Sequence, residues 1–140
     1  MKKYNFIDIT TADVAYEAYG RDLNELFSNA ALAMFEVMVE TDTVSCIVKK
    51  KVSVRGEDLE SLMFNWLNEL LYFYGAENML FSKFEVSVDI KKYELTAKIC
   101  GEKINPKRHE LKTEVKAATY HKMKIWNKNN MWIARVILDI

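Results

Sequence analysis

Apolar side chains recur at intervals of three and four residues in two segments of the chain, which is the spacing of one face of an α-helix. The two sets are Leu23, Leu26, Phe27, Ala30, Ala31, Met34, Val37 and Met38, and then Leu59, Leu62, Met63, Trp66, Leu67, Leu70, Leu71 and Tyr74. Asp22 and Glu25 have the spacing of a capping box at the start of the first helix. Asp58 predicts the N-cap of the second helix and Gly75 its C-terminal end.

The remaining segments alternate apolar and polar side chains, which is typical of β-strands with one buried face. These segments are residues 4–9, 14–19, 44–55, 84–90, 93–99, 115–125 and 132–138. Hairpins are predicted with a two-residue turn at 91–92 and a turn around 127–130. Residues 101–113 show no period and are predicted to form a loop. The order β-β-α-β-α-β-β-β-β predicts a single α+β domain over residues 1–140, with two long helices on a mixed, largely antiparallel sheet.

The composition is that of a compact globular protein. Of the 140 residues, 50% are hydrophobic, 29% are charged and one is a proline, which excludes collagen-like and disordered chains. The longest uncharged stretch, residues 26–35, is far shorter than the ~20 residues that cross a bilayer. Asn5 and Asp8 interrupt the apolar run that a signal peptide would need. We therefore predict a soluble cytoplasmic protein without membrane contact.

Charge is balanced overall but unevenly distributed along the chain. Residues 1–70 carry seven Lys/Arg and twelve Asp/Glu, whereas residues 71–140 carry thirteen and eight. Within the second half, the segment 101–128 combines three acidic residues (Glu102, Glu110, Glu114) with the basic residues Lys103, Lys107, Arg108, Lys112, Lys116, Lys122, Lys124 and Lys128. This segment is either a solvated strand face or an electrostatic footprint for RNA or an acidic protein surface.

Cys46 and Cys100 are the two cysteines of the chain, and both fall in alternating segments. Two cysteines in a chain of this length do not make a disulfide framework. We therefore predict two buried, unreactive thiols in a reducing compartment.

No motif for a catalytic centre is visible, so no catalytic residue is assigned and the protein is not predicted to be an enzyme. The chain has no glycine-rich phosphate loop, no paired-cysteine zinc motif and no nucleophile elbow. His109 falls in the irregular loop. His121 falls on a strand face with Val115 and Met123 and is predicted to be partly buried. Neither histidine has a neighbouring nucleophile or carboxylate that defines a role, so both are at most accessory residues.

Three carboxylates are the better candidates for chemistry. Asp13 lies on the short connection between the first two strands, where the alternative is an Asx-type turn. Asp139 and the carboxylate of Ile140 follow the last apolar strand. If the last strand lies beside the first hairpin, these three groups converge and repel each other unless a cation neutralises them. Ligation by oxygen alone suits a hard ion such as Ca²⁺ or Mg²⁺.

Several blocks along the whole chain resemble the archease family. They are Thr11-Ala12-Asp13-Val14, Ala18-Tyr19-Gly20, Ala30-Ala31-Leu32-Ala33-Met34-Phe35, Met38, Gly101-Glu102, His109-Glu110, Glu114-Val115-Lys116-Ala117-Ala118-Thr119-Tyr120-His121 and Val136-Ile137-Leu138-Asp139-Ile140. One departure is that Asp8-Ile9-Thr10 precedes the Thr-Ala-Asp block, with one extra residue and no histidine. The position of Asp13 is kept, whereas a role for Asp8 does not carry over.

The resemblance implies a small accessory protein and not an enzyme. Archeases are partners of the RtcB-type RNA ligase, which joins tRNA halves using GTP and Mn²⁺, and they promote its guanylylation and repeated turnover. They are also described as chaperone-like modulators of tRNA-modification enzymes. The resemblance assigns a divalent cation, Ca²⁺ with Mg²⁺ or Mn²⁺ as alternatives, to Asp13, Asp139 and Ile140. It places the family's lysine, Lys116, close by, so that Lys116, Asp13 and Asp139 are the expected ligase-activating residues.

Two functional hypotheses follow. The first is a metal-binding activator of an RNA ligase in tRNA splicing, with the ligase as its partner. The second is a chaperone-like or RNA-binding module that acts on tRNA or on a tRNA-modification enzyme through the basic segment 101–128. Binding to RNA phosphates would weaken steeply with salt, whereas ligase activation would depend on Asp13 and the C-terminal carboxylates.

Overall fold

The computed structural model describes residues 1–9 and 13–140, and these residues form two helices and two antiparallel sheets. The elements are β1 (Tyr4–Ile9), β2 (Asp13–Gly20), α1 (Leu23–Met38), the short 3-10 helix η1 (Thr41–Thr43), β3 (Val48–Arg55), α2 (Leu59–Glu77), β4 (Met79–Asp89), β5 (Glu94–Lys103), β6 (Ala117–Lys128) and β7 (Met131–Asp139). The α+β class and the predicted order of helices and strands are confirmed.

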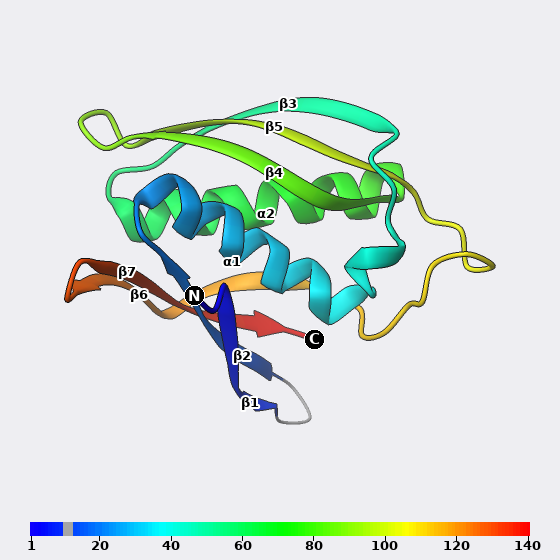
Figure 1. Ribbon diagram of the computed structural model, residues 1–140, viewed down its shortest axis with the longest axis horizontal. Coiled ribbons are helices and arrows are strands. Elements are labelled where there is room, and N and C mark those ends of the chain that lie inside the picture. Colours follow the sequence, from blue (N-terminus) through cyan, green and yellow to red (C-terminus); the bar gives the residue numbers. More distant parts are fainter. Residues whose placement is uncertain (10–12) are drawn as a thin grey trace.

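The helices lie between the two sheets (Figure 1). The strand order is β1-β2-β7-β6 in one sheet and β3-β5-β4 in the other. Every strand pair of the described residues is antiparallel, so the predicted mixed sheet is two separate antiparallel sheets. Helix α1 contacts β2, β4 and β7, and α2 contacts mainly β6 and β3. The strand β7 lies between β2 and β6, which brings the end of the chain to the start of β2.

Hydrogen bonds from buried aromatic side chains fix the helices in this layer. Tyr16 and Trp66 are fully buried. The Tyr16 hydroxyl donates to the carbonyl of Ala30 at 2.8 Å, which joins β2 to α1. The Trp66 indole N–H donates to the carbonyl of Phe27 at 3.0 Å, which joins α2 to α1. Because these polar atoms are satisfied inside the core, β2 is held against α1 three residues after Asp13.

The predicted helix starts are confirmed, whereas the predicted end of α2 is wrong. Asp22 accepts the N–H of Glu25, but the Glu25 carboxylate accepts the N–H of Arg21 and not that of Asp22, so the capping box predicted for α1 is only half formed. Asp58 forms a complete capping box with Ser61. Helix α2 continues past Gly75 and ends at Asn78, whose φ of 55° is left-handed. Asparagine tolerates this conformation, so it ends the helix in place of glycine.

Neither α1 nor α2 is long and apolar enough to cross a membrane, and the cytoplasmic location stays a prediction.

Two of the predicted loops have different bounds in the structure. Residues 101–103 extend β5, because they pair with β4 although their side chains do not alternate. The β4–β5 connection has four residues, 90–93, and Tyr93 has a φ of 50°. The β6–β7 turn consists of Asn129 and Asn130 with φ values of 53° and 63°, which is the left-handed pair that two-residue hairpins prefer.

Cys46 and Cys100 form a disulfide, so the prediction of two unreactive thiols is wrong. Their Cα atoms are 5.0 Å apart although 54 residues separate them in the chain. Cys46 is exposed and precedes β3, which begins only at Val48. The segment before β3 still lies against β5, since the Ile47 N–H donates to the Gly101 carbonyl at 3.0 Å. This contact between distant segments, which the alternating pattern does not reveal, places Cys46 beside Cys100 of β5.

Candidate metal site

Asp13 and Asp139 lie directly opposite each other where β2 begins and β7 ends. The antiparallel register pairs Asp13 with Asp139 and Val14 with Leu138. Val14 and Leu138 are buried, so the alternation directs both aspartates to the outer face of the sheet. Directly opposed residues have Cβ atoms about 5 Å apart. The structure therefore brings these two predicted carboxylates together, with Asp13 exposed and Asp139 half-buried.

Ile140 follows Asp139 and lines the inner side of the same sheet end. It borders a cavity of 250 Å³ together with Phe6, Val14, Glu36, Val37, Lys112 and Thr113. Glu36 is the acidic side chain of this cavity. Burial raises the pKa of its carboxyl, but hydrogen bonds from Thr41 and Lys112 outweigh burial and leave the pKa below its usual value. The negative charge of Glu36 is therefore already balanced by these donors. We do not count Glu36 as a third carboxylate beside Asp13 and Asp139.

Lys116 reaches the same sheet end through its backbone. Its N–H donates to the carbonyl of Asp139 at 2.8 Å, and the next residue, Ala117, pairs with Asp139 at the start of β6. The Lys116 side chain is exposed. A backbone hydrogen bond therefore fixes the position of Lys116 and leaves its side chain at the surface.

His109 is a buried structural residue away from this pair. Its side chain is 0% exposed, its Nδ1 accepts the N–H of Asn105 at 2.8 Å, and its Nε2 lies 3.0 Å from Glu102 Oε2. Since Nδ1 is an acceptor, the proton is on Nε2 and is donated to Glu102. Burial lowers the pKa of the His109 ring, and the charge of Arg108 lowers it further, which favours the neutral form.

Glu102 is a buried carboxylate that the sequence pattern did not identify. It is 4% exposed and accepts hydrogen bonds from Arg108, from His109 and, at 2.6 Å, from the backbone N–H of Ser45. It thus ties the β5–β6 connection to the segment that precedes β3. A glutamate in a stretch without periodicity gives no sign of such burial.

His121 is exposed, which contradicts its predicted partial burial. The register between β6 and β7 shifts between Thr119 and Lys124, and Lys122 has a φ of 58°. This irregularity changes the phase of the alternation, so that Ala118 before it and Met123 after it are both buried. His121 lies within this irregular stretch, whereas Ala117, the partner of Asp139, lies before it, so His121 is not part of the aspartate pair.

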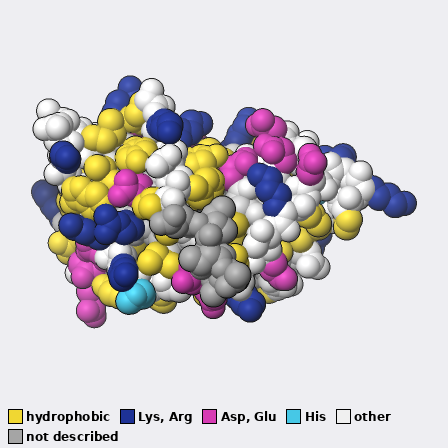
Figure 2. Space-filling model, turned by 90° about the horizontal axis from the view of Figure 1, so that it is seen from below, with side chains coloured by type: hydrophobic (Ala, Val, Ile, Leu, Met, Phe, Trp, Pro, Cys, Tyr) yellow, Lys and Arg dark blue, Asp and Glu magenta, His cyan; other side chains and the backbone are white. Residues whose placement is uncertain are grey.

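The basic segment 101–128 does not form one face. Lys103 donates to the carbonyl of Glu77, Arg108 pairs with Glu102, and Lys112 pairs with Glu36. The segment begins in one sheet and ends in the other. On the side of the four-stranded sheet, Lys and Arg side chains form several groups separated by acidic and hydrophobic ones (Figure 2). This distribution favours the solvated-surface interpretation of the segment.

The site offers oxygen donors that suit a hard cation. Two carboxylates face each other across β2 and β7, and like charges in directly opposed positions are unfavourable without a counterion. The described residues hold no group of three or more His, Cys, Asp and Glu side chains that could bind a metal, so a third anionic donor would have to be the carboxylate of Ile140. The Asx-turn alternative falls on residues 10–12, outside the described residues.

Comparison with known proteins identifies the family. A sequence model of the Archease protein family (MTH1598/TM1083) matches residues 4–140. The chain is 49% identical to protein archease of Sulfurisphaera tokodaii, and the alignment covers all of both chains. The solution structure of protein 1598 from Methanobacterium thermoautotrophicum has a TM-score of 0.87 and 46% identity, with full coverage of both chains. A crystal structure from Thermotoga maritima, described as an archease and possible chaperone, shares the fold at a TM-score of 0.63 and 20% identity, covering 94% of this chain and 93% of that one. The chain therefore belongs to the archease family.

Proposed function

We propose that this protein is a non-enzymatic accessory protein that activates an RtcB-type RNA ligase in tRNA splicing. The observation that carries the proposal is the direct opposition of Asp13 and Asp139 at the sheet end that also holds Lys116 and Ile140. Membership of the archease family supports an accessory role. We further propose the RtcB-type ligase as its partner, RNA as the substrate of that ligase, and a divalent cation as its ligand.

Asp13, Asp139 and the carboxylate of Ile140 are proposed to hold a divalent cation, Ca²⁺ with Mg²⁺ or Mn²⁺ as alternatives. Carboxylate oxygens are the ligands that these hard ions prefer. Both aspartates project from the outer face of the sheet, where a partner can approach them. When bound, the cation supplies positive charge that phosphate oxygens of a nucleotide can share with the carboxylates.

Lys116 is proposed to supply a second positive charge beside the aspartate pair. Its backbone is fixed by the hydrogen bond to Asp139, while its exposed amine can reach a phosphate group as a point charge. Together these groups would enter the rim of the ligase's nucleotide site and help to position GTP during guanylylation. No proton transfer is assigned to His109 or His121.

The central test is single-turnover guanylylation of a purified RtcB-type ligase by GTP and Mn²⁺, with and without this protein. The proposal requires a faster rate or a higher yield of guanylylated ligase when this protein is present. Equal rates and yields with a cognate ligase would contradict it. Bovine serum albumin at the same concentration is the control for nonspecific stabilisation of the ligase.

Asp139→Asn is expected to weaken cation binding and ligase activation together. The change removes one formal charge with little change in volume, and cation affinity depends on ligand charge. Thermal melts measure it: without metal, the variant melts at the same temperature as the parent or slightly higher, because one repulsive charge is gone. Added Ca²⁺ raises the melting temperature less in the variant than in the parent. Equal Ca²⁺ shifts in both proteins would place the cation elsewhere.

Lys116→Ala is expected to reduce ligase activation while leaving the fold intact. The side chain is exposed and the structural hydrogen bond comes from the backbone, which alanine keeps, so the free energy of unfolding changes by no more than about 0.5 kcal/mol. Guanylylation of the ligase measures activation. Lys107→Ala, at another exposed lysine, is the matched control. Full activation by the Lys116 variant would mean that this lysine is only a solvated side chain.

A further inference from the structure

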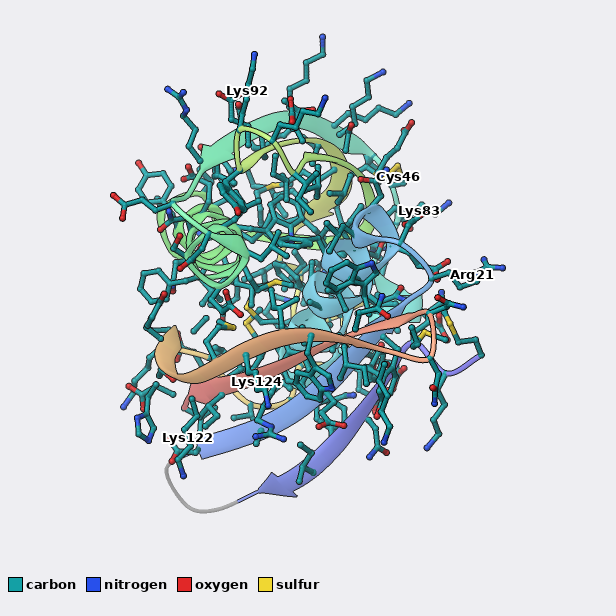
Figure 3. The ribbon with its side chains drawn as sticks, turned by 90° about the vertical axis from the view of Figure 1, so that its left-hand side faces the viewer. Arg21, Cys46, Lys83, Lys92, Lys122 and Lys124 are labelled. Carbon is teal, nitrogen blue, oxygen red and sulfur yellow. A yellow bond between two sulfur atoms is a disulfide. The ribbon has the colours of Figure 1, made fainter. Side chains whose placement is uncertain are left out.

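The outer face of the β3-β5-β4 sheet is polar and carries an excess of lysine. Along these strands the apolar residues face the helices, since Val52, Val54, Leu95, Ala97 and Ile99 are buried. The alternate positions are exposed, and we define the lysine face by Lys49, Lys51, Lys83 and Lys98 together with Ser53, Ser87 and Thr96. Figure 3 shows nitrogen-tipped side chains that point away from the helices on this side, with Lys83 and Cys46 close to each other.

The positive charge of the lysine face is concentrated at one end and is weakly compensated. Lys51 lies directly opposite Lys98, and Lys98 opposite Glu85. Among the described residues no ion pair involves any of the four lysines, whereas Arg55 at the other end pairs with Glu94 at 2.9 Å. Lysines on edge strands can prevent unwanted strand pairing. Lys98, however, is on the central strand β5, where that explanation does not apply.

The same face is hollowed. Two adjacent open hollows of 510 and 580 Å³ follow the sheet. Lys51, Lys98 and Glu85 border both of them, and the row of hydroxyls lies in the first. This row is formed by Ser53 and Ser87 on either side of Thr96 in the strand register. Lysines therefore adjoin short hydroxyl side chains along one extended depression.

We propose that the lysine face binds single-stranded RNA through its phosphate backbone. Lysine and hydroxyl side chains are the groups that contact phosphate and sugar in nucleic-acid complexes. A protein partner fits less well, because protein interfaces are depleted in lysine and enriched in aromatic residues. Phe84 borders the second hollow but packs against Phe35 of α1, and the outward-facing positions of the three strands hold no aromatic side chain. The hydroxyl row can exchange hydrogen bonds with the 2′-hydroxyl, the group that distinguishes RNA from DNA.

The absence of aromatic side chains from the lysine face also determines the kind of recognition. Base stacking on aromatic rings supplies much of the affinity of many single-strand binders, and this face cannot supply it. Binding is therefore electrostatic, independent of base sequence and strongly dependent on salt. If four lysines each neutralise one phosphate, the slope of log K against log salt is about −3, because each phosphate on a single strand contributes about −0.7.

The test is fluorescence anisotropy of a labelled uridine oligonucleotide of about 12 nucleotides, titrated with the full chain at several salt concentrations between roughly 50 and 200 mM. The parent is expected to bind with a slope of about −3, and an adenosine oligonucleotide to bind equally well. Lys51→Gln/Lys98→Gln is expected to weaken binding about tenfold or more at the lowest salt and to reduce the slope to about −1.4. Because this variant removes two opposed like charges, it melts at the same temperature or slightly higher.

Lys122→Gln/Lys128→Gln is the matched control, since it removes the same charge from exposed positions of β6 in the other sheet. It is expected to keep most of the affinity. Four results would overturn the proposal: no binding by the parent at the lowest salt, an equal loss in the control variant, equal affinity for the corresponding DNA, or equally effective competition by polyglutamate of the same charge. The last result would indicate an acidic protein surface as the partner. The measurement contains no ligase, so its outcome is independent of the proposed activation.

Discussion

Replacing both Cys46 and Cys100 by alanine is expected to lower the free energy of unfolding by about 4 kcal/mol, a value that follows from the length of the loop that the disulfide closes. The two cysteines are separated by 54 residues, so the unfolded chain gains considerable conformational freedom when the bond is absent. Alanine is preferred to serine because Cys100 is 7% exposed, and a serine hydroxyl there would need a hydrogen-bond partner. Guanidinium unfolding of the parent and the variant measures the difference through the midpoint and the slope.

A reducing agent provides the internal control for the disulfide. It is expected to lower the unfolding midpoint of the parent to nearly that of the double variant, and to leave the double variant unchanged. Thiol titration of the denatured, unreduced parent should find no free cysteine. Two titratable thiols per chain, together with a midpoint that does not respond to reductant, would show that the bond is absent in solution.

Gly101→Ala is expected to destabilise the protein by about 3 kcal/mol, which is a large value for the addition of one methyl group. A Cβ atom at this position would lie 1.8 Å from the carbonyl oxygen of Leu80 on the neighbouring strand. The obstacle is backbone and not a flexible side chain, so β4 and β5 would have to move apart beside the irregularity between Phe81 and Lys83. Urea or guanidinium unfolding measures the effect.

Gly75→Ala is the matched control for the close approach at Gly101. A Cβ atom at Gly75 meets nothing within 4 Å, and the residue lies inside α2. Alanine in a helix is more favourable than glycine by roughly 0.5–1 kcal/mol, so this variant should be more stable than the parent. Equal changes in the free energy of unfolding for both variants would contradict the close approach of β4 to β5 at Gly101.

The elements that sequence patterns predicted correctly are those whose signals are local. The two helices have long apolar stripes and N-capping aspartates, and the Asn129–Asn130 turn has residues that tolerate a positive φ. The errors arise where pairing with distant segments decides the structure. The phase of β6 changes at its irregularity near Lys122, and the end of α2 is decided by Asn78 and not by the nearby Gly75.

The candidate site was partly predictable for a similar reason. Asp13 begins β2 of the N-terminal hairpin and Asp139 ends β7, the last strand, so their approach depended on a single assumption, the pairing of β2 with β7. The register confirms that pairing. By contrast, the burial of Glu102 and His109 and the Cys46–Cys100 bond depend on how an aperiodic connection folds back onto the segment before β3. No residue pattern in either segment encodes that approach.

The central position of β7 in its sheet has a consequence for how the chain folds during translation. About 110 residues separate the end of β2 at Gly20 from the start of β7 at Met131. At ribosomal rates of roughly 5–20 residues per second, β7 is therefore synthesised on the order of 5–20 s after β2. During this interval one edge of the N-terminal hairpin exposes unpaired N–H and carbonyl groups to other nascent chains. Premature termination before Met131 would therefore remove the middle of the sheet and leave β2 and β6 with open edges. The four-stranded sheet can assemble only after β7 has left the ribosome.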